Sequence, residues 1–538
     1  MSKNNDWVKK LLSLVVLDLE GSNHSSELSV SLLDREAIVD QLTQKRVIYK
    51  KLGERVLRWI SFLESKNIKT GDRICLLAYN QIEHIELLLA CSRLGAIFVP
   101  LNFRLSVGEL QEIVDRVDPS FLFFSDCFVD HEIVLSCEQM CMTDINFQQF
   151  NNLPNKLSTD FSISDDTDVL MLFTSGSTGR PKGVLLNWKM LSVNQEETIK
   201  GWGLRSDDAT IVETPFFHTG GYNVLCLPLL SIGGKVVLAE KFDVDNVYQT
   251  FERERITVYF GVPTMFQMLS EHPMAVAESF ESIRFFVSGG AYCPEELIST
   301  FQDKGVAFIQ GFGLTEVGPN CFLLGDKDAL DKVGSIGRPM PHSKVLLLDD
   351  NDELITIPET VGELVIGGEH VCSSYYDEDD QFRESLYWDK ARELSYFRTG
   401  DLARFDNEGF YYIVGRKKEM YISGGENVYP AEVERKIRLH ESIDEVIVVP
   451  VSDAKWHEVG LCFYRGSGHE ITVDQLREFL NPILSRYKHP HYVVKVDSFP
   501  LLPNGKINRL KLKKMAEEYC SGLNANSFKN NIEQEVSL

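Results

Sequence analysis

The stretch LFTSGSTGRPKGV, residues 172 to 184, decides how the rest of this sequence is interpreted. The apolar run at 169–173 predicts a buried strand that stops abruptly at hydroxyl and glycine residues. The glycines let the backbone bring its N–H groups close to an anion, the Ser and Thr residues add hydroxyl donors, and Arg180 and Lys182 add positive charge. The stretch therefore predicts a phosphate-binding loop whose ligand is a nucleoside triphosphate.

This loop differs from the P-loop of the common NTPases. That pattern, G-x-x-x-x-G-K-[ST], fails here because Pro181 precedes Lys182 and Gly183 follows it. A plain surface turn is the alternative, since Gly, Ser and Thr also cluster in turns.

Length and composition narrow the class of protein. A chain of 538 residues predicts two or more domains, and 43% apolar with 25% charged residues is typical of a soluble globular protein. The formal net charge of -24 argues against a nucleic-acid partner, because the phosphates would be repelled. A site for ATP must therefore be locally basic.

The cysteines and the amino terminus bear on location. Eleven scattered cysteines predict reduced thiols in a cytoplasmic protein. The apolar segment at 7–17 is followed by Asp18 and Glu20 and lacks a cleavage site, so it predicts an amphipathic surface helix and not a signal peptide. Peripheral membrane contact through this helix is the alternative.

Strands and helices alternate along the chain. Strands are predicted at 74–78, 97–99, 236–238, 257–260 and 285–287. Ser106 and Glu109 form a capping box that starts one of the intervening helices, and another helix is predicted over 472–487. The alternation predicts an α/β fold with a mostly parallel sheet, whose ligands bind at the carboxyl ends of the strands.

Three segments after predicted strands carry candidate site residues. His218 precedes Gly220 and Gly221, although a lone histidine is also compatible with a structural role. The Ser-Gly-Gly-Ala segment at 288–291 is either a simple turn or a flat surface for adenine. In the segment at 310–316, Glu316 is a sensible partner for Mg²⁺, which takes one or two protein oxygens alongside those of phosphate.

The last third of the chain adds four more candidates. Asp401 follows Arg-Thr-Gly, and Arg416 begins the charged run Arg-Lys-Lys-Glu at 416–419, which also reads as an exposed linker. Lys506 lies in a Pro/Gly turn, where a lysine is ordinarily just exposed. Trp456 is compatible with packing on a domain surface or with covering a ligand.

Together and in this order, these motifs resemble those of the adenylate-forming superfamily. It includes acyl-CoA synthetases, the adenylation domains of peptide synthetases and beetle luciferases. The resemblance covers roughly residues 35 to 515. It implies an α/β fold with a large amino-terminal domain of parallel-rich sheets and helices, residues 1–415, and a small mobile α+β domain, residues 416–520. The hinge is at 416–419, and residues 521–538 are expected to be a disordered tail.

The resemblance also implies the roles of individual residues. The phosphate loop comprises Thr174, Ser175, Gly176, Ser177, Thr178, Gly179 and Lys182. The adenine and nucleotide contacts are Gly289, Gly290, Ala291, Gln310, Gly311 and Thr315, and the ribose contacts are Asp401 and Arg416. The metal residues are Thr178 and Glu316, and the catalytic residues are Lys506, Thr178, Glu316 and His218. Lys418 is the pivot, and Gly424, Gly425 and Trp456 approach coenzyme A. Some relatives carry glycine where His457 stands, which leaves the Trp456 contact open.

The resemblance implies two half-reactions that use ATP, Mg²⁺ and coenzyme A. The substrate carboxylate attacks the α-phosphate to give an acyl-adenylate and pyrophosphate, and a thiol then attacks the acyl carbon and expels AMP. The expected partners are small molecules: a carboxylic acid, ATP and coenzyme A. A homodimer is left open.

The acid substrate is inferred from the small residues near the predicted site. The small residues Gly220, Gly221, Gly289 and Gly290 leave room for an extended acyl chain, which favours a medium- or long-chain fatty acid. An aromatic or cyclic carboxylic acid, and loading of a carrier protein, are the alternatives. A non-catalytic nucleotide-binding regulator and a membrane-associated adaptor are the alternatives from other classes.

Overall fold

The computed structural model describes residues 6–19, 32–129, 137–144, 164–174, 181–501 and 507–522. The chain divides into two compact units. Unit 1 comprises Met1–Leu346, Val365–Thr399 and Glu408–Tyr411, and unit 2 comprises Leu347–Leu364, Gly400–Asn407 and Tyr412–Leu538. The division cuts four strands, β16 (Lys344–Leu348), β17 (Gly362–Gly367), β20 (Leu394–Phe405) and β21 (Tyr411–Arg416). The domain boundary and the hinge expected at 416–419 remain predictions.

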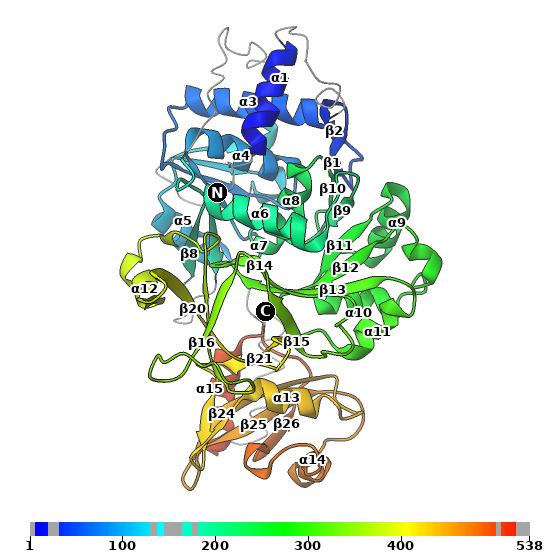
Figure 1. The fold of residues 1–538 in the computed structure, drawn as a ribbon, viewed down its shortest axis with the longest axis vertical. Helices are drawn as coiled ribbons and strands as arrows, with labels where there is room; N and C mark the ends of the chain where they lie inside the picture. The colour runs from blue at the N-terminus through cyan, green and yellow to red at the C-terminus, as the bar shows by residue number, and fades with distance from the viewer. Residues whose placement is uncertain are drawn as a thin grey trace. The chain divides into compact units, whose positions relative to one another are not determined.

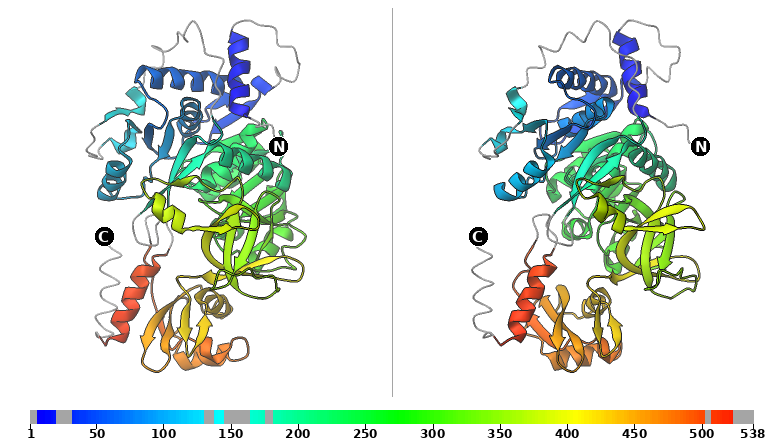
Figure 2. Two further views of the ribbon diagram at one scale, coloured as in Figure 1. Left: turned by 60° about the vertical axis from the view of Figure 1, so that its left-hand side comes forward. Right: turned by 90° about the vertical axis from the view of Figure 1, so that its left-hand side faces the viewer.

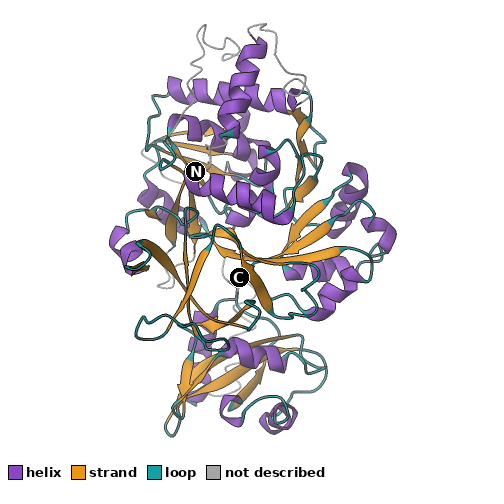
Figure 3. Cartoon of the chain, in the orientation of Figure 1, coloured by secondary structure: helices purple, strands orange, loops and turns teal. Residues whose placement is uncertain are grey.

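Unit 1 contains strands in three groups, with helices beside them (Figures 1 and 3). The first is a four-stranded sheet in the order β2 (Arg46–Ile48), β1 (Glu36–Asp40), β10 (Lys235–Leu238) and β9 (Ala209–Val212). The second is a seven-stranded sheet in the order β18 (Ser374–Tyr375), β8 (Lys182–Asn187), β7 (Asp168–Thr174), β4 (Ile97–Pro100), β3 (Arg73–Leu77), β5 (Phe121–Phe124) and β6 (Glu138–Cys141).

The third group runs β11 (Val258–Gly261), β12 (Phe285–Ser288), β13 (Ala307–Leu314), β14 (Gly318–Leu324) and β15 (Ser335–Pro339). A further strand, β19 (Leu386–Asp389), pairs with the start of β20. Strands β1, β10 and β9 run parallel, as do β11, β12 and β13, and as do β3, β4, β5 and β6. The predicted α/β fold with parallel-rich sheets is confirmed.

Apart from the first one, which precedes the first strand, the described helices of unit 1 lie between strands along the sequence. They are α1 (Trp7–Leu19), α3 (Tyr49–Ser65), α4 (Ile82–Leu94), α5 (Val107–Val117), α6 (Trp188–Trp202), α7 (Thr219–Asn223), α8 (Cys226–Ser231), α9 (Val244–Glu254), α10 (Pro263–Glu271), α11 (Glu295–Gln302) and α12 (Asp379–Glu384). Short 3-10 helices span Asp126–Phe128, Met142–Asp144 and Ala277–Phe280. The predicted capping box of Ser106 and Glu109 is present at the start of α5.

An aromatic core fixes the third group of strands. Phe251 of α9, Phe266 of α10 and Phe301 of α11 pack against Phe286 of β12 and Phe308 of β13, and all five side chains are fully buried. The ring of Phe286 lies edge-on to that of Phe301, with centroids 5.1 Å apart. This packing holds the parallel strands β12 and β13, whose carboxyl ends carry predicted site residues.

The amino-terminal helix α1 crosses α3, as the views in Figure 2 show. Its residues Val8, Leu12 and Val15 are completely buried, and a Cβ on Gly53 of α3 would lie 2.7 Å from Val15 Cγ2. The helix is therefore amphipathic, as predicted, with its apolar face packed inside unit 1 and Lys10 exposed. The alternative of peripheral membrane contact is untested. Of the helices in the described ranges, none has the length and apolar character needed to span a bilayer.

Unit 2 contains a five-stranded sheet with helices on both faces. Its strands are β22 (Tyr421–Ser423), β23 (Glu426–Val428), β24 (Glu445–Asp453), β25 (His457–Arg465) and β26 (Tyr492–Lys495). Its helices are α13 (Pro430–Ile437), α14 (Val473–Leu480), the 3-10 helix Arg486–Lys488 and α15 (Arg509–Cys520). Alternate residues of β24 enter two cores: Val446 and Val448 join one, and Ile447 and Val449 join the other.

Candidate nucleotide and acid site

The predicted phosphate loop begins and ends on one β-hairpin of unit 1. Strands β7 and β8 are antiparallel, and their register places Thr174 opposite Lys182 and Phe173 opposite Gly183. Residues 175–180 lie outside the described residues, so the predicted positions of Ser175, Gly176, Ser177, Thr178 and Gly179 are untested. The hairpin places Thr174 and Lys182 at the two ends of the loop, as a phosphate cradle between two strands requires.

A short strand, β18, holds the end of the loop. Tyr375 pairs with Val184 of β8, and the backbone N–H of Tyr376 donates to the carbonyl of Gly183 over 2.7 Å. Arg116 of α5 donates from Nη1 to the carbonyl of Pro181 and from Nη2 to that of Tyr376, each over 2.7 Å. These contacts fix the backbone on both sides of Lys182.

Tyr375 lies between the predicted phosphate lysine and the predicted metal carboxylate. The Lys182 Nζ is 4.6 Å from the centroid of the Tyr375 ring. The Tyr375 hydroxyl donates to Oε1 of Glu316 over 3.2 Å. Burial and the nearby Glu316 raise the pKa of Tyr375 far above its ordinary value, so the hydroxyl remains a proton donor. The structure thus brings Lys182 and Glu316 together around one buried ring.

Glu316 is fixed in the turn between β13 and β14. The backbone N–H of Cys372 donates to the Glu316 carbonyl over 2.7 Å. The described residues contain no group of three or more His, Cys, Asp or Glu side chains that could hold a metal ion. A single oriented carboxylate fits Mg²⁺ bound to a nucleotide, because this ion takes one or two protein oxygens and completes its shell with phosphate and water.

The carboxyl ends of the parallel strands β12 and β13 form the predicted adenine surface. Ser288 pairs with Gln310 in the register of these strands, and a Cβ on Gly289 would lie 3.4 Å from the carbonyl oxygen of Gly311. Gly290 has a φ of +81°, which glycine adopts without strain. The Nε2 of Gln310 is buried without a hydrogen-bond acceptor in the described part of the chain, as expected of a donor that faces a ligand. Ala291 is exposed, and Thr315 is half-buried.

The segment from Gln310 to Leu314 differs from its prediction. It was expected to follow a strand, yet it lies within β13, where Gly311 pairs with Leu323 of β14. A Cβ on Gly313 would lie 2.1 Å from the carbonyl oxygen of Gly318, so glycine permits the close approach of the two strands. Pairing with β14 therefore continues the strand through a glycine-rich segment.

The histidine element borders the same region. His218 is the residue before α7, and its ring lies 4.5 Å from that of Phe217. Asn80 anchors this loop, because its Nδ2 donates to the carbonyl of Thr214 over 3.1 Å and its Oδ1 accepts from the N–H of Phe216 over 3.0 Å. His218 is half-buried at the end of the loop.

Phe260 of β11 connects this loop to the Gly289 turn. A Cβ on Gly220 would lie 3.2 Å from Phe260 Cε1, and a Cβ on Gly289 would lie 3.3 Å from Phe260 Cε2. The expectation that these two glycines leave room for an extended acyl chain is wrong, because the Phe260 ring fills the space beside them. A Cβ on Gly221 would meet the carbonyl oxygen of Pro215 at 2.7 Å, so this glycine serves the turn.

The predicted ribose residues are together in unit 2. Arg416 Nε lies 2.8 Å from Asp401 Oδ1, and the Asp401 carboxylate is buried while the guanidinium is half exposed. The backbone N–H of Lys417 donates to the carbonyl of Gly400 over 2.9 Å, and Lys418 is exposed. Lys418 is therefore an exposed residue within unit 2, and its predicted roles as linker and pivot are untested.

The predicted coenzyme A segment is also in unit 2. The N–H of Gly424 donates to the carbonyl of Trp456 over 3.0 Å, and a Cβ on Gly424 would lie 2.7 Å from Trp456 Cε3. Gly424 and Gly425 have positive φ angles of 60° and 90°. The structure thus places Trp456 against Gly424, with part of the indole exposed. Lys506 lies outside the described residues, so its predicted position is untested.

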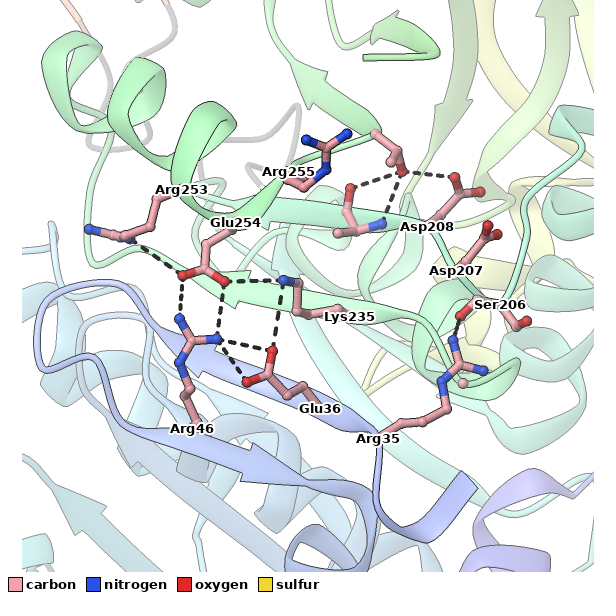
Figure 4. Close-up of a pocket in the computed structure, with 13 residues that line it drawn as sticks. Arg35, Glu36, Arg46, Ser206, Asp207, Asp208, Lys235, Arg253, Glu254 and Arg255 are labelled. Atoms are coloured by element: carbon pink, nitrogen blue, oxygen red, sulfur yellow. Dashed lines mark hydrogen bonds and ion pairs between the residues drawn. The ribbon is translucent and has the colours of Figure 1, made fainter. Parts of the chain in front are cut away.

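A charged cavity elsewhere in unit 1 has a different character (Figure 4). Its volume is about 530 Å³, and it lies at the amino ends of β1, β9 and β10. The buried Glu254 accepts from Arg46 over 2.6 Å and from Lys235 over 3.1 Å. Because its buried carboxylates are already paired with cations, we interpret this cavity as a network that joins β1, β2 and β10 to α9. The candidate site involves other strands, β7, β8, β12 and β13, together with the loop after the carboxyl end of β9.

The fold and the hairpin site together define an α/β enzyme that binds a nucleotide. Residues 30–376 match the family described as AMP-binding enzyme, and residues 432–506 match the AMP-binding enzyme C-terminal domain. The chain is 34% identical over 461 residues to a feruloyl-CoA synthase of Amycolatopsis sp, covering 85% of this chain and 92% of the relative. It is 33% identical over 481 residues to an indoleacetate–CoA ligase of Aromatoleum aromaticum, covering 87% and 92%.

A solved structure shares the fold. The o-succinylbenzoate coenzyme A synthetase from Bacillus subtilis, in complex with ATP and magnesium ion, aligns with a TM-score of 0.81 at 24% identity, covering 94% of this chain and 99% of that one. The chain belongs to the AMP-binding enzyme family, as its motifs predicted. It is an acyl-CoA synthetase, an ATP-dependent ligase that joins a carboxylic acid to coenzyme A.

Proposed function

We propose that the acid substrate is an aromatic or cyclic carboxylic acid. The observation that carries this proposal is the half-buried Phe260 ring between Gly220 and Gly289. A planar substrate gains from an aromatic neighbour, since offset or edge-to-face pairs add about 0.5–1.5 kcal/mol beyond burial. The names of the two relatives, which contain feruloyl and indoleacetate, support the same class over the fatty acid first favoured by the sequence.

In the first half-reaction, the chain's own residues handle the charge of the phosphates. Lys182 and the loop from Thr174 to Gly179 would hold the outgoing pyrophosphate, and Thr178 and Glu316 would hold Mg²⁺. When bound, Mg²⁺ neutralises charge on the phosphate oxygens. Lys506 stabilises the charge that develops on the α-phosphate as the substrate carboxylate attacks. Two unit charges ~4 Å apart at an effective dielectric of ~20 interact by about 4 kcal/mol, so one placed lysine has a large effect.

Further residues orient the nucleotide and the acid. Gln310 offers its buried Nε2 to adenine, which lies along Gly289, Gly290, Ala291 and Gly311 with Thr315 nearby. Asp401 and Arg416 receive the ribose, because a carboxylate accepts well from the two sugar hydroxyls. His218 closes the acid site beside Phe217.

The second half-reaction requires a path for the thiol. A rotation of the carboxyl-terminal domain about Lys418 withdraws Lys506 from the site. The same rotation presents Gly424 and Gly425 to the pantetheine arm, and Trp456 covers part of coenzyme A. The lack of side chains at these two glycines lets the arm pass close to the backbone.

The substrate class is tested by comparing acids in one assay. Thioester formation with ATP and coenzyme A is measured for a hydroxycinnamic acid, an indole carboxylic acid, octanoic acid and palmitic acid, and kcat/KM is compared. We expect the aromatic acids to exceed the fatty acids by at least about tenfold, and Phe260→Ala to reduce this preference. A higher kcat/KM for the fatty acids would contradict the proposal. If product forms with a carrier protein and not with coenzyme A, the acceptor is a carrier protein and not coenzyme A.

A further inference from the structure

Lys182 and Glu316 are far apart in the sequence, and the short strand β18 brings their side chains to one place. Tyr375 lies opposite Val184 in the antiparallel pair of β18 and β8. Lys182 is two residues from Val184 along β8, so it projects from the same face of the sheet and is a diagonal neighbour of Tyr375. This register explains why the Lys182 ammonium lies over the Tyr375 ring at 4.6 Å.

The other end of the same side chain orients Glu316. The Tyr375 hydroxyl donates to Oε1 of Glu316 over 3.2 Å, while the backbone of Cys372, three residues earlier, binds the Glu316 carbonyl. Only 3% of Tyr375 is exposed, and its ring packs edge-on against Phe382 at 5.4 Å. The tyrosine therefore has little freedom to change its orientation.

We propose that Tyr375 is a positioning residue that sets the separation between the phosphate-binding Lys182 and the metal-binding Glu316. This inference rests on the proposed roles of Lys182 and Glu316 in binding Mg-ATP. The ring restrains the lysine by a cation–π contact, and the hydroxyl restrains the carboxylate by a hydrogen bond. In this role Tyr375 acts through Lys182 and Glu316 and not by direct contact with the nucleotide or the metal.

The two functions of the side chain can be separated by substitution. Tyr375→Phe keeps the ring beneath Lys182 and against Phe382 but removes the donor to Glu316. Tyr375→Leu removes both contacts. Tyr376→Phe is the matched control, because the neighbouring Tyr376 hydroxyl donates to the carbonyl of Val117 over 3.3 Å and does not reach Glu316.

The experiment measures equilibrium binding of ATP to the full chain by isothermal titration calorimetry, without acid or coenzyme A. Each protein is titrated once with Mg²⁺ and once with EDTA, and the ratio of the two affinities gives the gain due to the metal. Removing a partner of a metal-binding carboxylate commonly costs 10–100-fold in metal affinity. We therefore expect Tyr375→Phe to lower the gain about tenfold with an unchanged affinity in EDTA. Tyr375→Leu should also weaken binding in EDTA by about threefold.

The outcomes separate this inference from the proposed function. A gain in Tyr375→Phe equal to that of the wild type overturns the inference and leaves the ligase assignment intact. The inference is also overturned if Tyr376→Phe lowers the gain due to the metal as much as Tyr375→Phe does. It is likewise overturned if a lower melting temperature of Tyr375→Phe accounts for its loss, because either result shows a general effect on β18. A wild-type protein that binds no ATP overturns both. Partial recovery of Tyr375→Phe turnover at high Mg²⁺ would support the assigned role.

Discussion

Two buried glutamates at opposite ends of the strands of unit 1 have opposite electrostatic environments. Glu254, beside the amino ends of β1 and β10, is paired with Arg46 and Lys235. Burial raises its pKa, but the hydrogen bonds from these cations outweigh burial and hold the pKa below its ordinary value. Glu213, after the carboxyl end of β9, accepts a hydrogen bond from the Tyr259 hydroxyl over 2.7 Å, and burial raises its pKa to about 8.

The difference indicates how the molecule divides stability and function. At the amino ends, carboxylates and cations neutralise each other, and the cavity of Figure 4 is lined by these pairs. At the carboxyl ends, Glu213 is buried without a cation among the described residues, and the amide of Gln310 is buried without an acceptor there. A buried polar group without a protein partner either binds a ligand or destabilises the fold. The positions of these two groups agree with ligand binding at the carboxyl ends of parallel strands.

The largest expected effect concerns the catalytic lysine. Lys506→Ala should lose at least ~100-fold in adenylation, because a single donor to the transition state commonly contributes that much. The variant should still form thioester from supplied acyl-adenylate, and its melting temperature should match that of the wild type. Both half-reactions are followed by separate single-turnover assays. Equal loss in the two would remove Lys506 from the role assigned to it.

A substitution at the amino ends of the strands, where Glu254 is paired with Arg46 and Lys235, should lower the stability of the protein and leave its activity unchanged. Glu254→Gln leaves Arg46 and Lys235 without their buried anion. Breaking a buried pair costs about 3–5 kcal/mol, and because these cations reach water we expect about 2 kcal/mol at pH 7. The lowered pKa means that this contribution is present above the unfolded pKa of Glu254 and is lost as pH falls through its folded pKa. Urea denaturation of the variant and the wild type at pH 7 and pH 4 measures the loss of stability and its pH dependence. A large rise in the KM for ATP of Glu254→Gln would contradict a purely structural role for this pair.

A pH dependence of opposite sign is expected at the other end. The folded protein holds a proton on Glu213 up to about pH 8, whereas the unfolded chain releases it near the ordinary value of 4.5. Stability is therefore greatest below the unfolded pKa and falls as pH rises toward 8, by at most about 1.4 kcal/mol per pH unit. Glu213→Gln, which keeps an acceptor for Tyr259, should remove this slope. The free energy of unfolding is measured by denaturation at several pH values from 5 to 8. The same pH dependence in the variant and the wild type would disprove the prediction.

Much of the fold was readable in the sequence because it depends on local patterns. The strand at 285–287 and the capping box of Ser106 and Glu109 follow from periodicity and spacing, and both are present. The helix predicted over 472–487 is shorter, because α14 ends at Leu480 just before Asn481-Pro482. The β13–β14 hairpin was missed, because tertiary pairing overrides the glycines of β13.

The site was predictable only where its residues form linear motifs. Lys182 and Glu316 lie in glycine-rich segments with recognisable order, whereas Tyr375 lies 59 residues from its partner Glu316 and has no spacing that points to chemistry. Its contacts arise from the pairing of β18 with β8. Phe260 was missed for a related reason: the sequence shows two glycines but not the ring that fills the space between them.

The most direct test is exchange of labelled pyrophosphate into ATP in the presence of an aromatic acid and the absence of coenzyme A. We expect exchange that depends on the acid, falls at least ~100-fold in Lys182→Ala and is retained in Glu254→Gln. Exchange that is absent with every acid, or that falls equally in the two variants, would contradict the assignment of catalysis to the site that contains Lys182 and Glu316.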